Sequence, residues 1–203
     1  NLHFNVMAAS SFYSGDPRAA LRDGFRKTEA DLMYEQHRHA GGVGGGCCGT
    51  TAVLMLLRDE QLHVGWLGDC RAVLCRAGSA VPLTVDHCLT DANERARAVA
   101  DGGKIDGGRL GGYLEVARAL GDFDHRIGTK PPGLSAQPAV HSEVMGGEDE
   151  FVILGSDGLW GVVPNDDAVR IVRGARAPRT LALPRLIAHV GSPRLASPRR
   201  VIV

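Results

Sequence analysis

The sequence lacks any apolar run long enough to cross a membrane. None of its segments approaches the roughly 20 consecutive apolar residues that span a bilayer, so we expect no contact with a membrane. No signal peptide is visible, and the chain begins at Asn1 rather than Met, so we expect an N-terminal segment to be missing. With 203 residues, 44% of them hydrophobic, the composition suits one globular domain with a core of its own.

The sequence also lacks a paired Cys-x-x-Cys motif. The five cysteines, odd in number, are Cys47, Cys48, Cys70, Cys75 and Cys88. This pattern favours free thiols in a reducing compartment, and therefore an intracellular protein, cytoplasmic or nuclear or both. A zinc site built from His37, His39, Cys47 and Cys48 remains an alternative, although the adjacent cysteines are poorly spaced for one ion.

Acidic residues are absent from the end of the chain. All 23 of them lie at or before Asp167, and the last 36 residues contain eight arginines and no carboxylate. These arginines alternate with prolines and have no aromatic neighbours, so stacking on nucleic-acid bases is not expected. We interpret residues 174–203 as an atypical basic C-terminal end, solvated or poorly folded.

The order of predicted elements indicates an α+β fold with antiparallel sheets. Asp16 and Pro17 are typical of a helix start, and Asp91 is placed to cap a second helix, with Glu94 positioned for a capping box. The predicted helices are 17–36, 92–100, 164–173 and 180–190, and residues 37–49 form a glycine-rich loop. The predicted strands are 51–57, 62–67, 71–75, 81–85, 151–154 and 201–203. Strands joined by turns this short indicate antiparallel pairing.

Three segments place an aspartate beside a glycine at the end of an apolar run. They are Leu67-Gly-Asp69, Leu120-Gly-Asp122 and Leu154-Gly-Ser-Asp157. We expect the Asp157 carboxylate to lie at the tip of a buried strand, where its charge is costly without a compensating cation. Carboxylates without Cys or His clusters favour Mg²⁺ or Mn²⁺ over zinc. The alternative is that each aspartate only stabilises a turn.

Several motifs together resemble the type 2C, metal-dependent protein serine/threonine phosphatases, and the plant members in particular. They occur in the family's order over roughly two thirds of the chain. The matching segments are Gly49-Thr-Thr-Ala-Val-Leu, Val64-Gly-Trp-Leu-Gly-Asp-Cys-Arg-Ala-Val-Leu, Pro82-Leu-Thr-Val-Asp-His, Glu94-Arg-Ala-Arg, Gly102-Gly-Lys, Ala117-Arg-Ala-Leu-Gly-Asp, Gln137-Pro-Ala-Val and residues 151–165.

The resemblance implies an antiparallel β-sandwich flanked by helices on both sides, a four-layer α-β-β-α fold. It also implies two Mg²⁺ or Mn²⁺ ions held by aspartates, and a water between them that attacks phosphoserine or phosphothreonine in line. By position, Asp157 resembles a metal ligand of the family, and Asp69 the acid that helps to hold a weaker third ion. Gly158, Arg118 and Asp122 match supporting positions.

The sequence departs from the family's pattern at the residues that carry its chemistry. The Asp-Gly-His-Gly-Gly segment, with the bridging aspartate and the histidine general acid, is absent, and so is the phosphate-binding arginine upstream of it. Gly161 replaces the usual aspartate after Trp160. The family's last metal-binding aspartate has no counterpart in the stretches around Gly191 or Ser197. No residue of this chain can therefore be assigned a catalytic role with certainty.

The sequence is thus interpreted as a single, incomplete phosphatase domain over residues 1–203. We expect a metal-dependent phosphoprotein phosphatase whose activity, for this chain by itself, is impaired or absent. The alternative is a phosphatase-fold protein that does no chemistry and binds a phosphoprotein, a kinase or another regulatory partner. A nucleotide-binding function is disfavoured, because residues 41–46 lack the Gly-Lys-Ser/Thr of a phosphate loop.

Overall fold

The computed structural model describes residues 1–39, 48–124 and 127–176. The helices of these ranges are α1 (Leu2–Ala8), α2 (Ser10–Tyr13), α3 (Pro17–His39), α4 (Ala92–Ala100), α5 (Asp157–Trp160) and α6 (Asn165–Arg176). The longer strands are β2 (Ala52–Arg58), β3 (Gln61–Leu67), β4 (Arg71–Arg76), β5 (Ser79–Pro82), β9 (Ala139–Val144) and β10 (Asp149–Gly155). Two-residue strands complete the list: β1 (Gly49–Thr50), β6 (Ile105–Asp106), β7 (Arg109–Leu110) and β8 (Leu120–Gly121).

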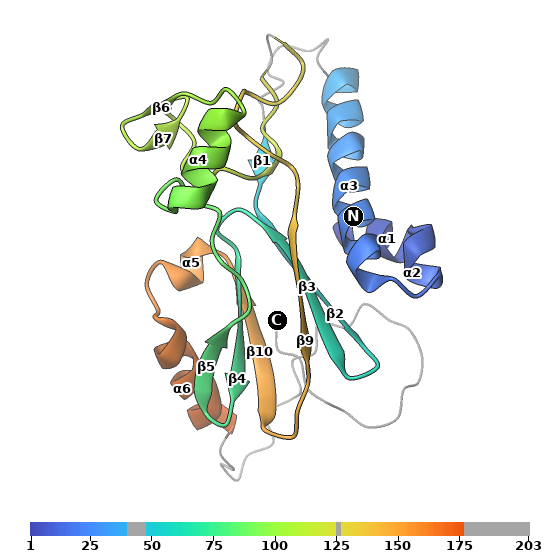
Figure 1. Ribbon diagram of the computed structural model, residues 1–203, viewed down its shortest axis with the longest axis vertical. Coiled ribbons are helices and arrows are strands. Elements are labelled where there is room, and N and C mark those ends of the chain that lie inside the picture. The colour runs from blue at the N-terminus through green and yellow to red at the C-terminus, as the bar shows by residue number, and fades with distance from the viewer. Residues whose placement is uncertain (40–47, 125–126, 177–203) are drawn as a thin grey trace.

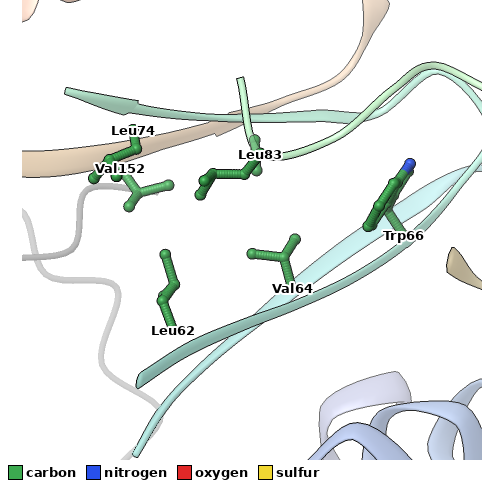
Figure 2. Packing of buried hydrophobic residues seen from close by; sticks show 7 residues of the cluster. Leu62, Val64, Trp66, Leu74, Leu83 and Val152 are labelled. Carbon is green, nitrogen blue, oxygen red and sulfur yellow. The ribbon is translucent and has the colours of Figure 1, made fainter. Parts of the chain in front are cut away.

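Two antiparallel three-stranded sheets form the centre of the molecule (Figure 1). One has the order β2-β3-β9 and the other β10-β4-β5. Leu62, Val64 and Trp66 project from β3 toward the second sheet, where they meet Leu74 and Val152 (Figure 2). These side chains are almost fully buried, so the hydrophobic contact between the sheets is the main core of the sandwich.

Helices cover the outer face of each sheet, which gives four layers (Figure 1). Leu21 of α3 and Val6 of α1 pack against Leu54 and Val140 of the first sheet. On the other side, Val169 of α6 joins a buried cluster with strands β4 and β10. The predicted α-β-β-α architecture with antiparallel sheets is confirmed.

A smaller apolar cluster lies beside the sandwich, around α4 and the β6–β7 hairpin (Figure 1). Its buried members include Leu89, Ala98, Leu110 and Leu134. The start of α4 is capped as predicted, because the Asp91 carboxylate accepts hydrogen bonds from the N–H groups of Asn93 and Glu94 at 3.0 and 2.9 Å.

The expected capping box at α4 is wrong. The Asp91 N–H donates to the Cys88 carbonyl at 3.1 Å. The Glu94 carboxylate instead turns toward two arginines, Arg97 and Arg118. Ion pairs with these arginines therefore take the place of the hydrogen bond that a capping box would form between the Glu94 side chain and the Asp91 N–H.

The long helix α3 begins where the sequence predicts. The Asp16 carboxylate accepts a hydrogen bond from the Ala19 N–H at 2.9 Å, and the helix continues beyond the predicted end to His39. The sequence did not predict α1, which is held by tertiary contacts. Asn5 donates to the Thr28 hydroxyl at 2.9 Å, and Gly24 leaves room for Val6, whose Cγ2 lies 2.1 Å from the position of a Cβ at Gly24.

The strand predicted at residues 81–85 ends at Pro82 in the structure. The Ala72 N–H bonds the Thr84 hydroxyl at 2.9 Å, so a side chain replaces the next carbonyl of the ladder. Strand β9 was not predicted, because its centre is polar. His63 and Arg76 satisfy that polar stretch by bonding Ser142 and Glu143, at 2.8 and 2.9 Å.

Two predicted elements, the helix at 180–190 and the strand at 201–203, lie outside the described residues, as does most of the basic end that was predicted to begin at residue 174. Residues 174–176 belong to α6. Among the residues that the structure describes, no helix combines the length and the hydropathy of a membrane span.

The packing between the sheets predicts how two leucine substitutions will differ. Leu74 is fully buried, whereas Leu57 at the end of β2 is 44% exposed. We expect Leu74→Ala to lower the free energy of unfolding by about 2–5 kcal/mol and Leu57→Ala by about 1 kcal/mol or less, measured by urea denaturation. Equal losses would show that the face between the sheets is not the main core.

Candidate metal centre

The pairing of β4 with β10 brings two of the predicted site residues to the same edge of one sheet. In the antiparallel register, Gly155 of β10 lies opposite Arg71 of β4. Asp69 precedes Arg71 by two positions, and Asp157 follows Gly155 by two positions. Since neighbouring antiparallel strands end at a common edge, the two carboxylates lie on adjacent segments, although they are 88 positions apart in the sequence.

The electrostatics of Asp69 reflect this proximity. Asp69 is half-buried in the turn between β3 and β4, and burial raises the pKa of its carboxyl group. The negative charges of Asp157 and Asp86 raise that pKa further, while a hydrogen bond from Thr51 works in the opposite direction. A carboxylate near like charges is stabilised by a cation.

The expectation that Asp157 is buried at a strand tip is wrong. The chain leaves β10 at Gly155, and Asp157 is the first residue of the short helix α5, with its side chain exposed. Solvent therefore compensates much of its charge, and burial is not the reason for a cation here. What favours a cation here is the closeness of the negatively charged Asp157 and Asp69 carboxylates.

A polar frame holds the two strand ends in register. The Trp160 indole N–H donates to the carbonyls of Gly155 and Arg71, at 3.0 and 3.2 Å. The Arg71 guanidinium lies over the Trp160 ring, 5.6 Å from its centre. It also donates to both oxygens of Asp86, at 3.1 and 2.7 Å, and to Asn165 at 2.8 Å. Trp160 is 8% exposed, so it is a buried anchor of this frame.

Sequence reasoning missed the roles of Asp86, Arg71 and Thr51. Asp86 also follows apolar residues, Leu83 and Val85, but it lacks the neighbouring glycine by which the three aspartates were singled out. Only part of that signal was therefore present in the sequence. The pairing of Asp86 with Arg71 was not, because it depends on how the chain folds back after β5.

Asp122 lies apart from this acidic pair. Burial raises the pKa of its carboxyl group, and Lys130 is the charged residue that opposes this effect. Asp122 has a φ of 51°, in the left-handed region, and the space beside its carboxyl group is available only because Gly49 has no side chain. The structure therefore does not bring the three Gly-Asp segments together, but only those of Asp69 and Asp157.

A partly buried lysine holds the segment before Asp122 against α3. Lys130 donates to the Ala119 and Gly121 carbonyls and forms an ion pair with Glu29 of α3 at 2.9 Å. The second Glu29 oxygen accepts from the Gly121 N–H at 2.9 Å. Burial lowers the pKa of Lys130, although Glu29 favours its charged form.

Arg118, the other predicted supporting residue, is the centre of a structural ion-pair network. Its guanidinium makes a two-point contact with Glu94 and donates to the Gln137 carbonyl at 3.0 Å. Burial by itself would raise the pKa of Glu94, but hydrogen bonds from Arg118 and Arg97 outweigh it and lower the pKa. The network joins α4 to the segment that leads into β9.

Gly158 is exposed in the first turn of α5. A side chain there would meet only the Ser156 hydroxyl, at 3.5 Å. Gly155 and Gly161 are more restricted, because a Cβ would lie 2.9 Å from Trp160 and 2.7 Å from the Asp157 carbonyl respectively. Close packing therefore accounts for those two glycines and not for Gly158.

The described residues fit part of a site for a hard cation. Asp69 and Asp157 offer carboxylate oxygens, which Mg²⁺ and Mn²⁺ prefer, and their mutual repulsion would be relieved by a positive charge. Within the described ranges, no group of three or more His, Cys, Asp or Glu side chains is arranged to hold a metal. The pair would therefore supply only part of the oxygen ligands that such an ion requires.

Of the four residues of the zinc alternative, Cys47 lies outside the described residues. His37 bonds the Met33 carbonyl at 2.8 Å within α3. The cysteines that the structure describes, Cys48, Cys70, Cys75 and Cys88, are free thiols, as expected.

Comparison with known proteins identifies the family to which this fold belongs. The family model described as Protein phosphatase 2C matches residues 1–197, so the chain belongs to the protein phosphatase 2C family. This confirms the resemblance found in the sequence motifs, and it identifies the family as one of protein phosphatases, which are hydrolases.

Curated relatives agree with this assignment. Probable protein phosphatase 2C 30 of Arabidopsis thaliana is 37% identical over 207 residues, which is 96% of this chain and 50% of that protein. Probable protein phosphatase 2C 47 of Oryza sativa subsp. japonica is 46% identical over 127 residues, 62% of this chain and 32% of that one. The chain thus spans a third to a half of the length of these relatives.

Among solved structures, a serine-threonine phosphatase 2C from Toxoplasma gondii has a similar fold. Its TM-score is 0.73 at 21% sequence identity, over 86% of this chain and 67% of that one. At this identity the likeness concerns the fold alone, and it agrees with the four layers seen in Figure 1.

A buried histidine beside the site predicts a pH dependence of stability. His87 is 5% exposed, it stacks on Trp66 with 5.7 Å between ring centres, and its Nδ1 has no hydrogen-bond partner among the described residues. Burial, with Arg118 nearby, lowers the pKa of His87 from 6.5 to about 4. The unfolded chain therefore binds a proton in this interval that the folded chain does not, and stability falls as the pH drops from 6.5 to about 4.

His87→Phe keeps the aromatic stack and removes the titration. We expect the variant to lose less stability over that interval, by up to about 1.4 kcal/mol for each pH unit, measured by urea denaturation at a series of pH values. The comparison with the parent isolates His87 from the carboxylates, which titrate in both proteins. Identical pH profiles would contradict a neutral, buried imidazole at this position.

Proposed function

We propose that this protein takes part in the cation-dependent hydrolysis of phosphoserine and phosphothreonine in proteins. The observation that carries the proposal is the pair Asp69 and Asp157, set side by side at one sheet edge by the pairing of β4 with β10. Membership of the protein phosphatase 2C family supports it, because the family acts on phosphoproteins. The chain spans half of one of the relatives described above and a third of the other, so the activity of the whole protein is proposed here for this chain by analogy.

The chain's own residues would contribute the following parts. Asp157 and Asp69 would hold Mg²⁺ or Mn²⁺ through their carboxylate oxygens. Arg71 and Trp160 would keep the two strand ends in register, through the contacts with Asp86 and with the Gly155 carbonyl. Such a cation, when bound, supplies positive charge near the phosphate and lowers the pKa of water.

We further propose that this chain by itself binds the cation weakly and turns over phosphoprotein slowly or not at all. Two carboxylates among the described residues supply only a few of the oxygen ligands that a divalent ion takes, and they offset only half of the positive charge of two such ions. The printed sequence also has glycine at position 161 and no acidic residue after Asp167. Weak cation binding and slow turnover are consistent with both features.

A non-catalytic role is the second candidate. The same sparse set of carboxylates would suit a phosphatase-fold protein that binds a phosphoprotein, a kinase or another regulatory partner without hydrolysing it. The free thiols of the described cysteines are consistent with either role in a reducing, intracellular compartment.

Cation binding can be measured directly by titrating the chain with Mn²⁺ and following the free ion by electron paramagnetic resonance. We expect a dissociation constant weaker than micromolar, and we expect Asp157→Asn to weaken binding about tenfold or more, because it removes a charged ligand. Asp59→Asn is the matched control. It lies in the turn at the opposite end of β3 from Asp69 and should leave binding unchanged.

Turnover should be assayed with a phosphoserine peptide and Mn²⁺ on the same preparations. Slow release of phosphate that Asp157→Asn abolishes and Asp59→Asn does not would support the catalytic proposal. Peptide binding without any release would favour the non-catalytic role. Tight binding of two Mn²⁺ ions by the parent chain would overturn the proposal of weak cation binding.

A further inference from the structure

A groove of about 560 Å³ lies between α3 and the segment that leads into β9. One wall is a single face of α3, on which Arg22, Arg26 and Glu29 are spaced by four and three positions. The other wall consists of Ala136, Gln137 and Pro138. Neither wall contains Asp69 or Asp157, so the groove is separate from the acidic pair.

The free charges of this groove are positive. Both carboxylates that line it are already engaged: Asp23 accepts from Ser11 at 2.7 Å and from Arg26 at 3.0 Å, and Glu29 holds Lys130 and the Gly121 N–H. The Arg22 side chain is exposed and forms no hydrogen bond or ion pair with any other described residue. The Arg26 side chain uses one nitrogen for Asp23 and is 83% exposed.

The groove borders the edge of the sandwich that carries Asp69. Gln137 accepts a hydrogen bond from Arg118, and the Arg118 carbonyl lies 3.0 Å from the position of a Cβ at Gly68. Strand β9 begins directly after the groove residue Pro138, and its first residue, Ala139, pairs with Trp66 of β3. Trp66 lies three positions before Asp69, which agrees with this placement. A peptide whose phosphoresidue lies near Asp69 could therefore extend along the groove.

We propose that this groove binds an acidic segment of the phosphoprotein, next to the phosphorylated residue. Carboxylates of such a segment would meet the planar guanidinium groups of Arg22 and Arg26, which match carboxylate geometry. The inference rests on the proposed function, because it defines a substrate class for the same site. It differs from that proposal in requiring binding alone and no turnover.

The test compares two pairs of labelled phosphoserine peptides by fluorescence anisotropy, with the full chain and no added metal. Within each pair, one peptide has a run of glutamates beside the phosphoserine and the other has glutamines there. The run precedes the phosphoserine in one pair and follows it in the other. We expect the parent to prefer one acidic peptide about threefold or more. The preference should shrink between about 0.1 M and about 1 M NaCl, because salt screens exposed charges.

Substitutions assign the preference to the groove. Arg22→Gln, which breaks no side-chain contact among the described residues, should reduce the preference by about half, and the double variant with Arg26→Gln should abolish it. Asp23→Asn removes an opposing charge and should increase it. Arg95→Gln is the matched control, an exposed arginine on α4 outside the groove, and should leave it unchanged.

The outcomes separate this inference from the proposed function. A preference lost in the Arg22 and Arg26 variants supports the groove even if no phosphate is ever released. Equal binding of acidic and neutral peptides, or an equal loss with Arg95→Gln, overturns it even if the chain is an active phosphatase. Binding that follows anionic lipid vesicles and not the acidic peptides would also overturn it.

Discussion

The antiparallel register between β4 and β10 is the constraint on which the candidate site depends. With Gly155 opposite Arg71, the turn that carries Asp69 and the helix that carries Asp157 begin at the same sheet edge. A slip of one residue would turn every side chain of one strand to the other face. Since Leu74 and Val152 face the first sheet whereas Val73 and Phe151 face α6, burial on both faces specifies the register strongly. Hydrophobic packing thus determines where the two carboxylates lie.

Polar contacts then fix the positions of the segments that hydrophobic packing brings together. The Trp160 indole joins the end of β10 to the start of β4, and Arg71 connects that edge to Asp86. On the other side, Glu29 and Lys130 hold the segment before Asp122 against α3. These pairs are partly buried and use several donors each, so they resemble the hydrogen-bonded ion pairs whose disruption is costly. They position segments without touching the acidic pair.

Sequence reasoning was most accurate where a local signal is sufficient. The hairpins at Asp59 and Ala77 were recognised from short turns, and both residues have the positive φ that tight hairpin turns require. The cap at Asp16 and the apolar strands were also found. Reasoning from sequence missed α1 and β9, which depend on contacts with distant residues, Thr28 and His63 among them. It also placed Asp157 in the interior, because an apolar strand before an acid does not reveal the direction in which the chain leaves the sheet.

The sequence by itself determined the family, the antiparallel α+β class and the identity of Asp69 and Asp157 as the residues of interest, because motifs and turn residues act over a few positions. Only the tertiary structure decided which aspartates meet. Asp122 shares the Gly-Asp pattern, yet it lies beside Lys130, since β8 pairs with β1 and not with β4. The groove along α3 was likewise invisible in the sequence, because its two walls are more than a hundred positions apart and are brought together by the packing of α3 on the first sheet.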